Sequence, residues 1–95
     1  MSEMLTRLEG VIRERRAHPR AESYTNRLFD SGVNKIAQKV GEEATEVVVA
    51  ALGQGRAEQI SELADLFYHT LVLMAQLDIT LDDVLAELER RHRPE

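Results

Sequence analysis

Two groups of carboxylates stand out in the sequence because of their spacing. Glu42, Glu43 and Glu46 form an E-E-x-x-E pattern, and Glu62 and Asp65 form an E-x-x-D pattern further along the chain. Residues three apart lie on one face of a helix, so each pattern can direct two side chains to one point. Carboxylates gathered in a small volume repel one another strongly unless a cation lies between them. The spacing therefore predicts a metal site formed by Glu43, Glu46, Glu62 and Asp65.

The ligand types indicate which cation such a site would bind. Carboxylate oxygens suit Mg²⁺ or Mn²⁺ rather than Zn²⁺, and Mg²⁺ commonly takes phosphate oxygens as further ligands. Lys35 and Lys39 precede the acidic residues and are candidates for binding those phosphates. Two other interpretations stay open at this point. A single E-x-x-E is most often a solvated helix face, and the lysines can form i, i+4 ion pairs worth a few tenths of a kcal/mol.

Both acidic groups lie in segments with helical periodicity. The apolar residues of 33–52 recur within one sector of a helical wheel, and this period continues through Val47, Val48 and Val49, whose β-branched side chains would otherwise favour a strand. We expect this helix to end at 53–55, where glycines occur. Residues 57–77 form a second helix that is apolar around most of its circumference and should be buried on several sides. Its only polar stripe is narrow, and it contains the following side chains: Glu62, Asp65, His69 and Gln76.

The remaining segments also favour helices. Residues 3–16 have an amphipathic pattern and precede a loop at 17–23, and a short helix or turn begins at Ser23. Ser31 is expected to cap the next helix. Thr80 and Asp83 have the spacing of a helix cap before a last helix. The sequence therefore predicts an all-α fold of four or five helices.

Three further residues have expected structural roles. His69 lies one turn after Asp65 and is more readily explained as a hydrogen-bonded core histidine than as a metal ligand. Tyr24 is expected to be a helix-capping and packing residue. Gly41, in the middle of a helix, costs roughly 1 kcal/mol relative to alanine; close packing of a neighbouring helix would explain it more readily than close approach of a ligand.

Composition limits the class of protein. With 95 residues the chain is expected to form one domain, 1–95, small enough that self-association would bury part of its apolar surface. The net charge of −5 and only four aromatic residues disfavour nucleic-acid binding, although eight of the 12 Lys and Arg residues lie in 1–40. No segment is apolar enough to span a membrane, and the chain contains no cysteine. We expect a cytoplasmic protein with no membrane partner.

Several motifs resemble one enzyme superfamily. The E-E-x-x-E pattern followed after 15 residues by E-x-x-D is similar to the MazG-like all-α nucleotide pyrophosphohydrolases. Three longer motifs look more specifically like phosphoribosyl-ATP pyrophosphohydrolase of histidine biosynthesis: S-Y-T-x-x-L at 23–28, G-x-x-K-I-x-x-K-x-G-E-E-A at 32–44 and A-D-L-x-Y-H-x-L-V-L at 64–73. The resemblance covers nearly the whole chain.

The resemblance implies a fold, an activity and a cofactor. It implies a MazG-like bundle completed by homodimerisation, in which Mg²⁺ supports hydrolysis of phosphoribosyl-ATP to phosphoribosyl-AMP and pyrophosphate. Glu42, Glu43 and Glu46 are then candidate catalytic residues, and Glu42 or another carboxylate free of metal would accept the proton of the attacking water. The chain looks monofunctional, without a phosphoribosyl-AMP cyclohydrolase domain. Two alternatives are a house-cleaning nucleoside triphosphate pyrophosphohydrolase and a non-catalytic helical dimerisation module.

Overall fold

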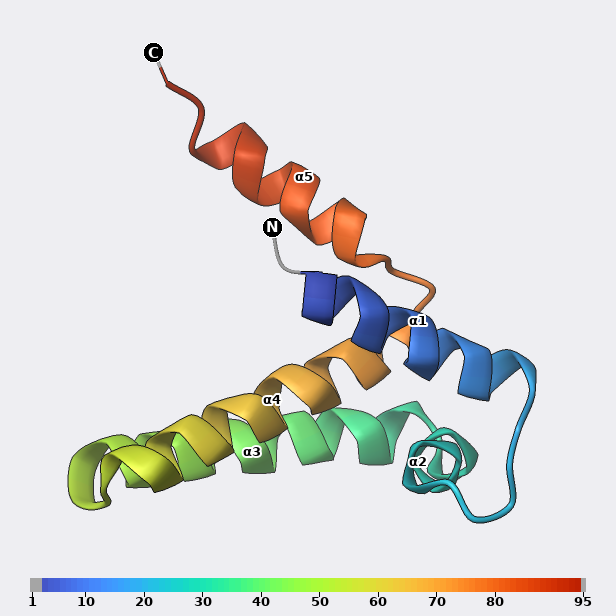
Figure 1. The fold of residues 1–95 in the computed structure, drawn as a ribbon, viewed down its shortest axis with the longest axis horizontal. Coiled ribbons are helices and arrows are strands. Elements are labelled where there is room, and N and C mark those ends of the chain that lie inside the picture. The colour runs from blue at the N-terminus through green and yellow to red at the C-terminus, as the bar shows by residue number, and fades with distance from the viewer. Residues whose placement is uncertain (1–2, 95) are drawn as a thin grey trace.

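A computed structural model describes residues 3–94 as a set of five helices (Figure 1). The helices are α1 (Glu3–Ala17), α2 (Tyr24–Ser31), α3 (Val33–Gly53), α4 (Arg56–Gln76) and α5 (Leu81–Arg91). No strand occurs within 3–94, so the all-α prediction is confirmed. None of these helices is long and apolar enough to cross a membrane.

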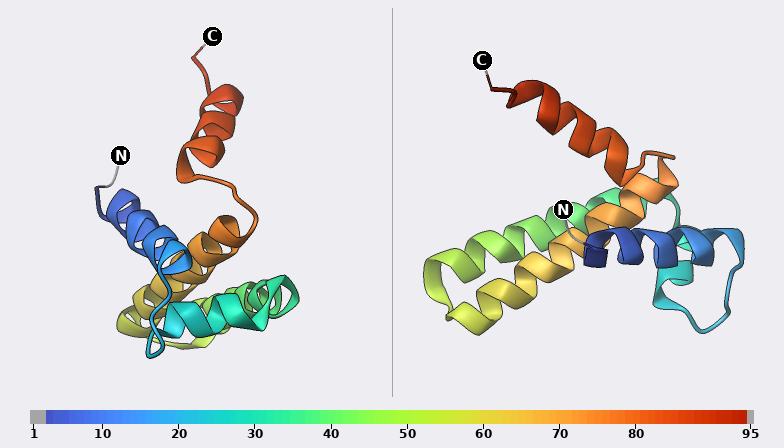
Figure 2. Two further views of the ribbon diagram at one scale, coloured as in Figure 1. Left: turned by 90° about the vertical axis from the view of Figure 1, so that its right-hand side faces the viewer. Right: turned by 45° about the horizontal axis from the view of Figure 1, so that its top comes forward.

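α3 and α4 form an antiparallel hairpin, which is the longest feature of the fold (Figures 1 and 2). Each helix has 21 residues, and Val47–Val49 are helical because the apolar period continues through them. Gly53 lies in the last turn of α3, and Gln54 follows with an extended backbone, φ −119°. The predicted end of this helix at 53–55 is therefore confirmed.

The core lies where α1 and α2 pack against the C-terminal half of α4 and the start of α3. One residue each comes from α1, α2 and α3 and three come from α4: Ile12, Leu28, Ile36, Leu71, Val72 and Ala75. Figure 2 shows that the half of the hairpin that contains the α3–α4 connection extends beyond α1 and α2. That half contains Glu62 and Asp65.

Local capping sets the ends of the short elements. Ser23 caps α2 by accepting a hydrogen bond from the Asn26 amide, and Thr80 and Asp83 form the predicted capping box of α5. The prediction for Ser31 is wrong, because Ser31 is the last residue of α2 and its hydroxyl donates to Leu28 O at 2.6 Å. Gly32 precedes α3 instead, with a φ of +88° that favours glycine.

The prediction that α4 is buried on several sides is wrong for the single chain. Ile60, Leu63 and Phe67 are 55%, 43% and 52% exposed. α5 projects away from the other helices (Figures 1 and 2). An apolar groove of about 400 Å³ lies between α4 and α5, and its lining includes Phe67, Met74 and Leu88. The chain thus exposes apolar surface that a folded domain normally buries.

Candidate active site

Three carboxylates converge between the two long helices. Glu43 comes from the middle of α3, and Glu62 and Asp65 come from the facing half of α4; each offers an oxygen, and these oxygens lie within 4.8 Å of one another. The antiparallel hairpin creates this proximity, because it brings the middle of α3 opposite the first half of α4. The predicted convergence of the two acidic groups therefore appears in the structure for these three residues.

Glu43 is the buried member of the group. Its side chain is 9% exposed, and Lys39 Nζ lies 3.4 Å from its Oε1. Its other oxygen, Oε2, is buried and has no hydrogen-bond partner among residues 3–94. A buried carboxylate oxygen without a partner costs free energy unless a cation or a donor satisfies it. The donor set and this oxygen fit a hard divalent cation.

Glu46 joins the cluster through Glu62 rather than through Glu43. A hydrogen bond with Glu46, together with burial and the negative charges of Glu46 and Asp65, raises the pKa of Glu62 to about 7. Glu46 is exposed and is not one of the three residues whose oxygens converge. The raised pKa of Glu62 reflects the crowding of carboxylates at this point of the hairpin.

Glu42 is not among the three carboxylates whose oxygens converge. It is exposed, accepts a hydrogen bond from Gln38 Nε2 at 2.8 Å and lies 3.8 Å from Lys39 Nζ. Burial lowers the pKa of Lys39, but the charge interaction with Tyr24 and the partners Glu43 and Glu42 raise it overall above its ordinary value. Lys39 is therefore a stable cation beside the cluster.

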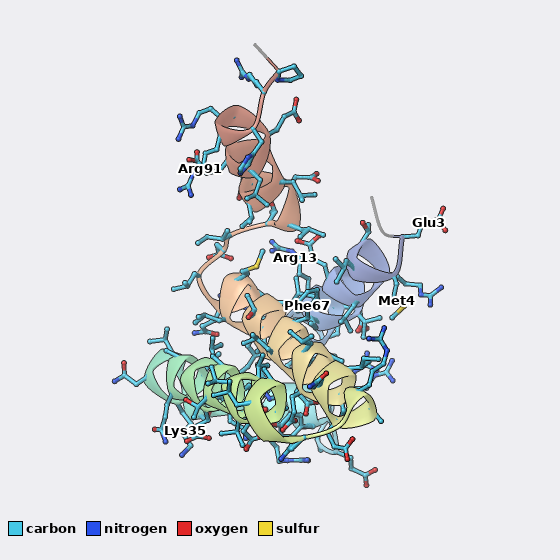
Figure 3. All side chains as sticks on the ribbon, turned by 90° about the vertical axis from the view of Figure 1, so that its left-hand side faces the viewer. Glu3, Met4, Arg13, Lys35, Phe67 and Arg91 are labelled. Carbon is cyan, nitrogen blue, oxygen red and sulfur yellow. The ribbon has the colours of Figure 1, made fainter. Side chains whose placement is uncertain are left out.

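Lys35 differs from Lys39. It is exposed on the outer side of α3 (Figure 3), and no ion pair within 3–94 involves it. The structure thus associates one of the two predicted phosphate-binding lysines with the carboxylates. Gly41 lies between the two lysines and Glu43 in the sequence, and it has open space where a Cβ would lie. The prediction that a neighbouring helix packs closely against Gly41 is therefore wrong within the chain.

A group of rings adjoins the carboxylates. His69 is buried, its Nδ1 lies 2.7 Å from the Asp65 carbonyl oxygen, and its Nε2 lies 3.0 Å from the Tyr24 hydroxyl. The hydrogen-bonded role expected for His69 is confirmed. Tyr68 stacks with Tyr24, and its hydroxyl contacts Thr25. Sequence reasoning missed this link between α2 and α4, because the contacts join residues 43 and 45 positions apart.

The fold and the site define an all-helical protein in which a helical hairpin brings together carboxylates of the kind that bind divalent cations. A family model described as phosphoribosyl-ATP pyrophosphohydrolase matches residues 5–92. The chain therefore belongs to the phosphoribosyl-ATP pyrophosphohydrolase family.

Curated relatives agree over nearly the whole chain. It is 54% identical to a phosphoribosyl-ATP pyrophosphatase of Pyrobaculum islandicum, over 96% of this chain and 97% of that protein. It is 55% identical to the protein of the same name from Pyrobaculum aerophilum, over 94% and 95% of the two chains. It is also 49% identical to the histidine biosynthesis bifunctional protein HisIE of Oceanobacillus iheyensis, where the match covers 95% of this chain and 42% of the longer protein.

Proposed function

We propose that this protein hydrolyses phosphoribosyl-ATP to phosphoribosyl-AMP and pyrophosphate, the second step of histidine biosynthesis. The observation that carries the proposal is the convergence of Glu43, Glu62 and Asp65 within 4.8 Å, in a chain that the family model matches from residue 5 to 92. The relatives' names support the same reaction. An anhydride between phosphates is a substrate for which a carboxylate-bound cation and a lysine are suitable.

The carboxylates would hold one or more Mg²⁺ ions, with Mn²⁺ as a substitute. Glu43, Glu46, Glu62 and Asp65 are the proposed ligands, and the unpartnered Glu43 Oε2 supports a cation at this point. A bound Mg²⁺ neutralises charge on phosphate oxygens and makes a coordinated water more acidic. Because metal ligands must be deprotonated, the proton that the raised pKa of Glu62 favours would leave when the cation binds.

The protein's own side chains would orient the substrate and move the proton. Lys39, and more weakly the exposed Lys35, would bind the triphosphate oxygens. A water attacks the α-phosphorus, the bond to the bridging oxygen breaks, and pyrophosphate leaves. Glu46 or Glu42 would accept the proton of the water. Glu46 would act as this base only while it is not a metal ligand; it interacts with Glu62, whereas Glu42 accepts a hydrogen bond from Gln38.

We further propose that the working protein is a homodimer. The chain has a radius of gyration of 14.7 Å, whereas a compact domain of this length has about 12 Å. Its accessible surface is 6772 Å², about 1,200 Å² more than a monomeric protein of this mass usually exposes. That excess exceeds the roughly 800 Å² that each partner buries in a standard interface. Ile60, Leu63 and Phe67 on α4 are the surface that a second copy would cover.

Light scattering tests the dimer. Phe67→Asp places a charge in the proposed interface, so we expect it to convert the dimer to a monomer, while Val11→Asp, at an exposed apolar residue of α1, serves as control. A wild-type protein that is monomeric at micromolar concentration would rule the dimer out.

Substrate comparison tests the function. We expect hydrolysis of phosphoribosyl-ATP to be far faster than that of ATP and other plain nucleoside triphosphates, and to stop when EDTA removes the metal. Faster cleavage of plain triphosphates would keep the site but assign a house-cleaning activity. Binding of neither metal nor nucleotide by the folded protein would instead favour a dimerisation module.

A further inference from the structure

The proposed substrate carries a phosphate for which the carboxylate cluster does not account. Phosphoribosyl-ATP has a triphosphate at one end and, on the ribose that its adenine carries in addition, a separate phosphate monoester. The carboxylates Glu43, Glu62 and Asp65 and the neighbouring Lys39 are suited to the triphosphate. Plain ATP has the same triphosphate, so a preference for phosphoribosyl-ATP needs contacts to the added phosphate or its ribose.

The positive charges of the chain lie mainly on one side of the cluster. Between residues 40 and 89, Arg56 is the only lysine or arginine, whereas eight basic residues lie in 1–40. The end of the hairpin opposite the α3–α4 connection adjoins α2 and the loop before it (Figure 1). Tyr24 at the start of α2 contacts His69 at 3.0 Å, and His69 contacts the Asp65 carbonyl oxygen at 2.7 Å. Charge therefore favours an added anionic group on the α2 side of the cluster.

A cavity of about 580 Å³ lies at the loop between α1 and α2. The residues that line it are consecutive in the loop, apart from one in the last turns of α1: Arg15, Arg20, Ala21, Glu22 and Ser23. Ser23 directly precedes Tyr24, so the cavity adjoins the residue that contacts His69. Two arginines and one glutamate leave an excess of positive charge, as an anion site requires.

One buried side chain fixes the backbone of both arginines. Asn26 is 6% exposed, its Nδ2 donates to the Arg15 carbonyl oxygen at 2.7 Å, and its Oδ1 accepts from the Arg20 amide at 2.8 Å. The end of α1 and the loop are thereby held together by a single amide group. Because the two backbones are already fixed, a ligand that binds both side chains has less conformational freedom to remove.

The two guanidinium groups have donors available for a ligand. The Arg15 side chain is 25% exposed, and its one ion pair within 3–94 is with the adjacent Glu14, at 3.1 Å from Nη1. A guanidinium group has five N–H donors, and an ion pair with a carboxylate that is 47% exposed is weak. Arg20 forms no ion pair among the described residues. Guanidinium groups bind phosphate through two parallel hydrogen bonds, so both arginines suit this ligand.

We propose that this cavity binds the phosphoribosyl end of the substrate. Arg15 and Arg20 donate hydrogen bonds to the phosphate monoester, and Glu22, which repels a phosphate but accepts hydrogen bonds, binds hydroxyl groups of the ribose. This inference rests on the proposed function, because it assigns the part of phosphoribosyl-ATP that does not react. Arg15 and Arg20 determine specificity and take no part in the hydrolysis at the other end of the molecule.

Comparison of two substrates tests the site kinetically. We expect Arg15→Met and Arg20→Met each to lower kcat/KM for phosphoribosyl-ATP about 10- to 100-fold, as for one lost charge-assisted hydrogen bond, and to leave the slow hydrolysis of ATP unchanged. Arg56→Met, which removes an exposed arginine at the other end of the hairpin, is the control and should affect neither substrate. Arg20 is exposed in a loop, so its variant reports on binding even if Arg15→Met fails to fold.

Product binding tests the site without the reaction. Calorimetry in EDTA compares phosphoribosyl-AMP with AMP, which lacks the phosphoribosyl group. We expect the wild type and Arg56→Met to bind phosphoribosyl-AMP about 10- to 100-fold more tightly than AMP, and Arg15→Met and Arg20→Met to lose most of this difference.

Different outcomes refute the two proposals. A wild type that binds the two products equally, or equal losses in Arg15→Met, Arg20→Met and Arg56→Met, would overturn the phosphoribosyl site even if phosphoribosyl-ATP is hydrolysed. Conversely, a wild type that fails to hydrolyse phosphoribosyl-ATP would overturn the proposed function. A preference for phosphoribosyl-AMP that the Arg15 and Arg20 variants lose would then still support the site.

Discussion

Replacing Glu43 by glutamine separates metal binding from folding at the proposed site. Glu43 is the buried carboxylate of the cluster, and one of its oxygens has no hydrogen-bond partner within residues 3–94. Glutamine has nearly the same shape and lacks the charge. We therefore expect Glu43→Gln to leave the metal-free protein about as stable as the wild type and to remove most of the stabilisation that Mg²⁺ provides.

The two electrostatic contributions of Glu43 nearly offset each other without metal. At an effective dielectric constant near 20, two charges 4.8 Å apart repel by roughly 3.5 kcal/mol, and opposite charges 3.4 Å apart attract by roughly 5 kcal/mol. Glu43 experiences the repulsion from both Glu62 and Asp65, although Glu62 is partly protonated because its pKa is raised to about 7. The attraction to Lys39 is weakened because that side chain is 32% exposed. The net change should be within about 1 kcal/mol.

The effect of the metal is larger. Mg²⁺ at 100 times its dissociation constant stabilises the folded state by about 2.7 kcal/mol, which raises the melting temperature of a domain of this size by roughly 10–20 °C. If the loss of one charged ligand weakens binding about 100-fold, the same Mg²⁺ concentration contributes about 0.4 kcal/mol, or roughly 2–3 °C.

Thermal unfolding followed by far-UV circular dichroism, with Mg²⁺ and with EDTA, measures both quantities. Glu58→Gln is the matched control, because Glu58 is an exposed carboxylate on the same helix as Glu62 but outside the cluster. An equal Mg²⁺-dependent shift in Glu43→Gln and the wild type would show that Glu43 does not bind the cation.

Three further predictions follow from individual residues. Glu46→Gln should abolish hydrolysis of phosphoribosyl-ATP and preserve the helical circular dichroism spectrum; a rate near that of the wild type at saturating Mg²⁺ would remove Glu46 from the catalytic group. The folded-state pKa of Glu62 is raised from 4.5 to about 7, so the folded protein binds more protons than the unfolded chain in this range. The metal-free protein should therefore lose stability as pH rises from 4.5 to about 7, and Glu62→Gln should lack this loss in urea titrations at several pH values. Ile36 is fully buried, and Ile36→Ala should lower the free energy of unfolding, measured by urea titration, by about 2–5 kcal/mol. A decrease below about 1 kcal/mol would mean that neighbouring side chains move into the cavity that the substitution leaves.

The sequence alone predicts the long helices and the meeting of their carboxylates. Helical periodicity is repeated over many residues in α3 and α4, so it outweighs the β-branched residues 47–49. A short connection between two long amphipathic helices favours an antiparallel hairpin. Glu43, Glu62 and Asp65 then converge because helical spacing and hairpin pairing both constrain their positions.

Other features depend on tertiary contacts that spacing does not encode. Gly32 rather than Ser31 precedes α3, because the backbone there has a φ of +88°, which glycine adopts readily. The exposure of Phe67 depends on which elements cover α4, and α5 projects away instead of covering it (Figures 1 and 3). The contact between Tyr24 and His69 joins residues 45 positions apart, and neither residue follows a pattern that identifies the other.

The most direct measurement is product analysis of phosphoribosyl-ATP incubated with the purified wild-type protein and Mg²⁺. We predict phosphoribosyl-AMP and pyrophosphate in equal amounts, with no reaction when EDTA is present. Unchanged substrate in the presence of folded protein and Mg²⁺, or release of single phosphate in place of pyrophosphate, would contradict hydrolysis between the α and β phosphates at this carboxylate site.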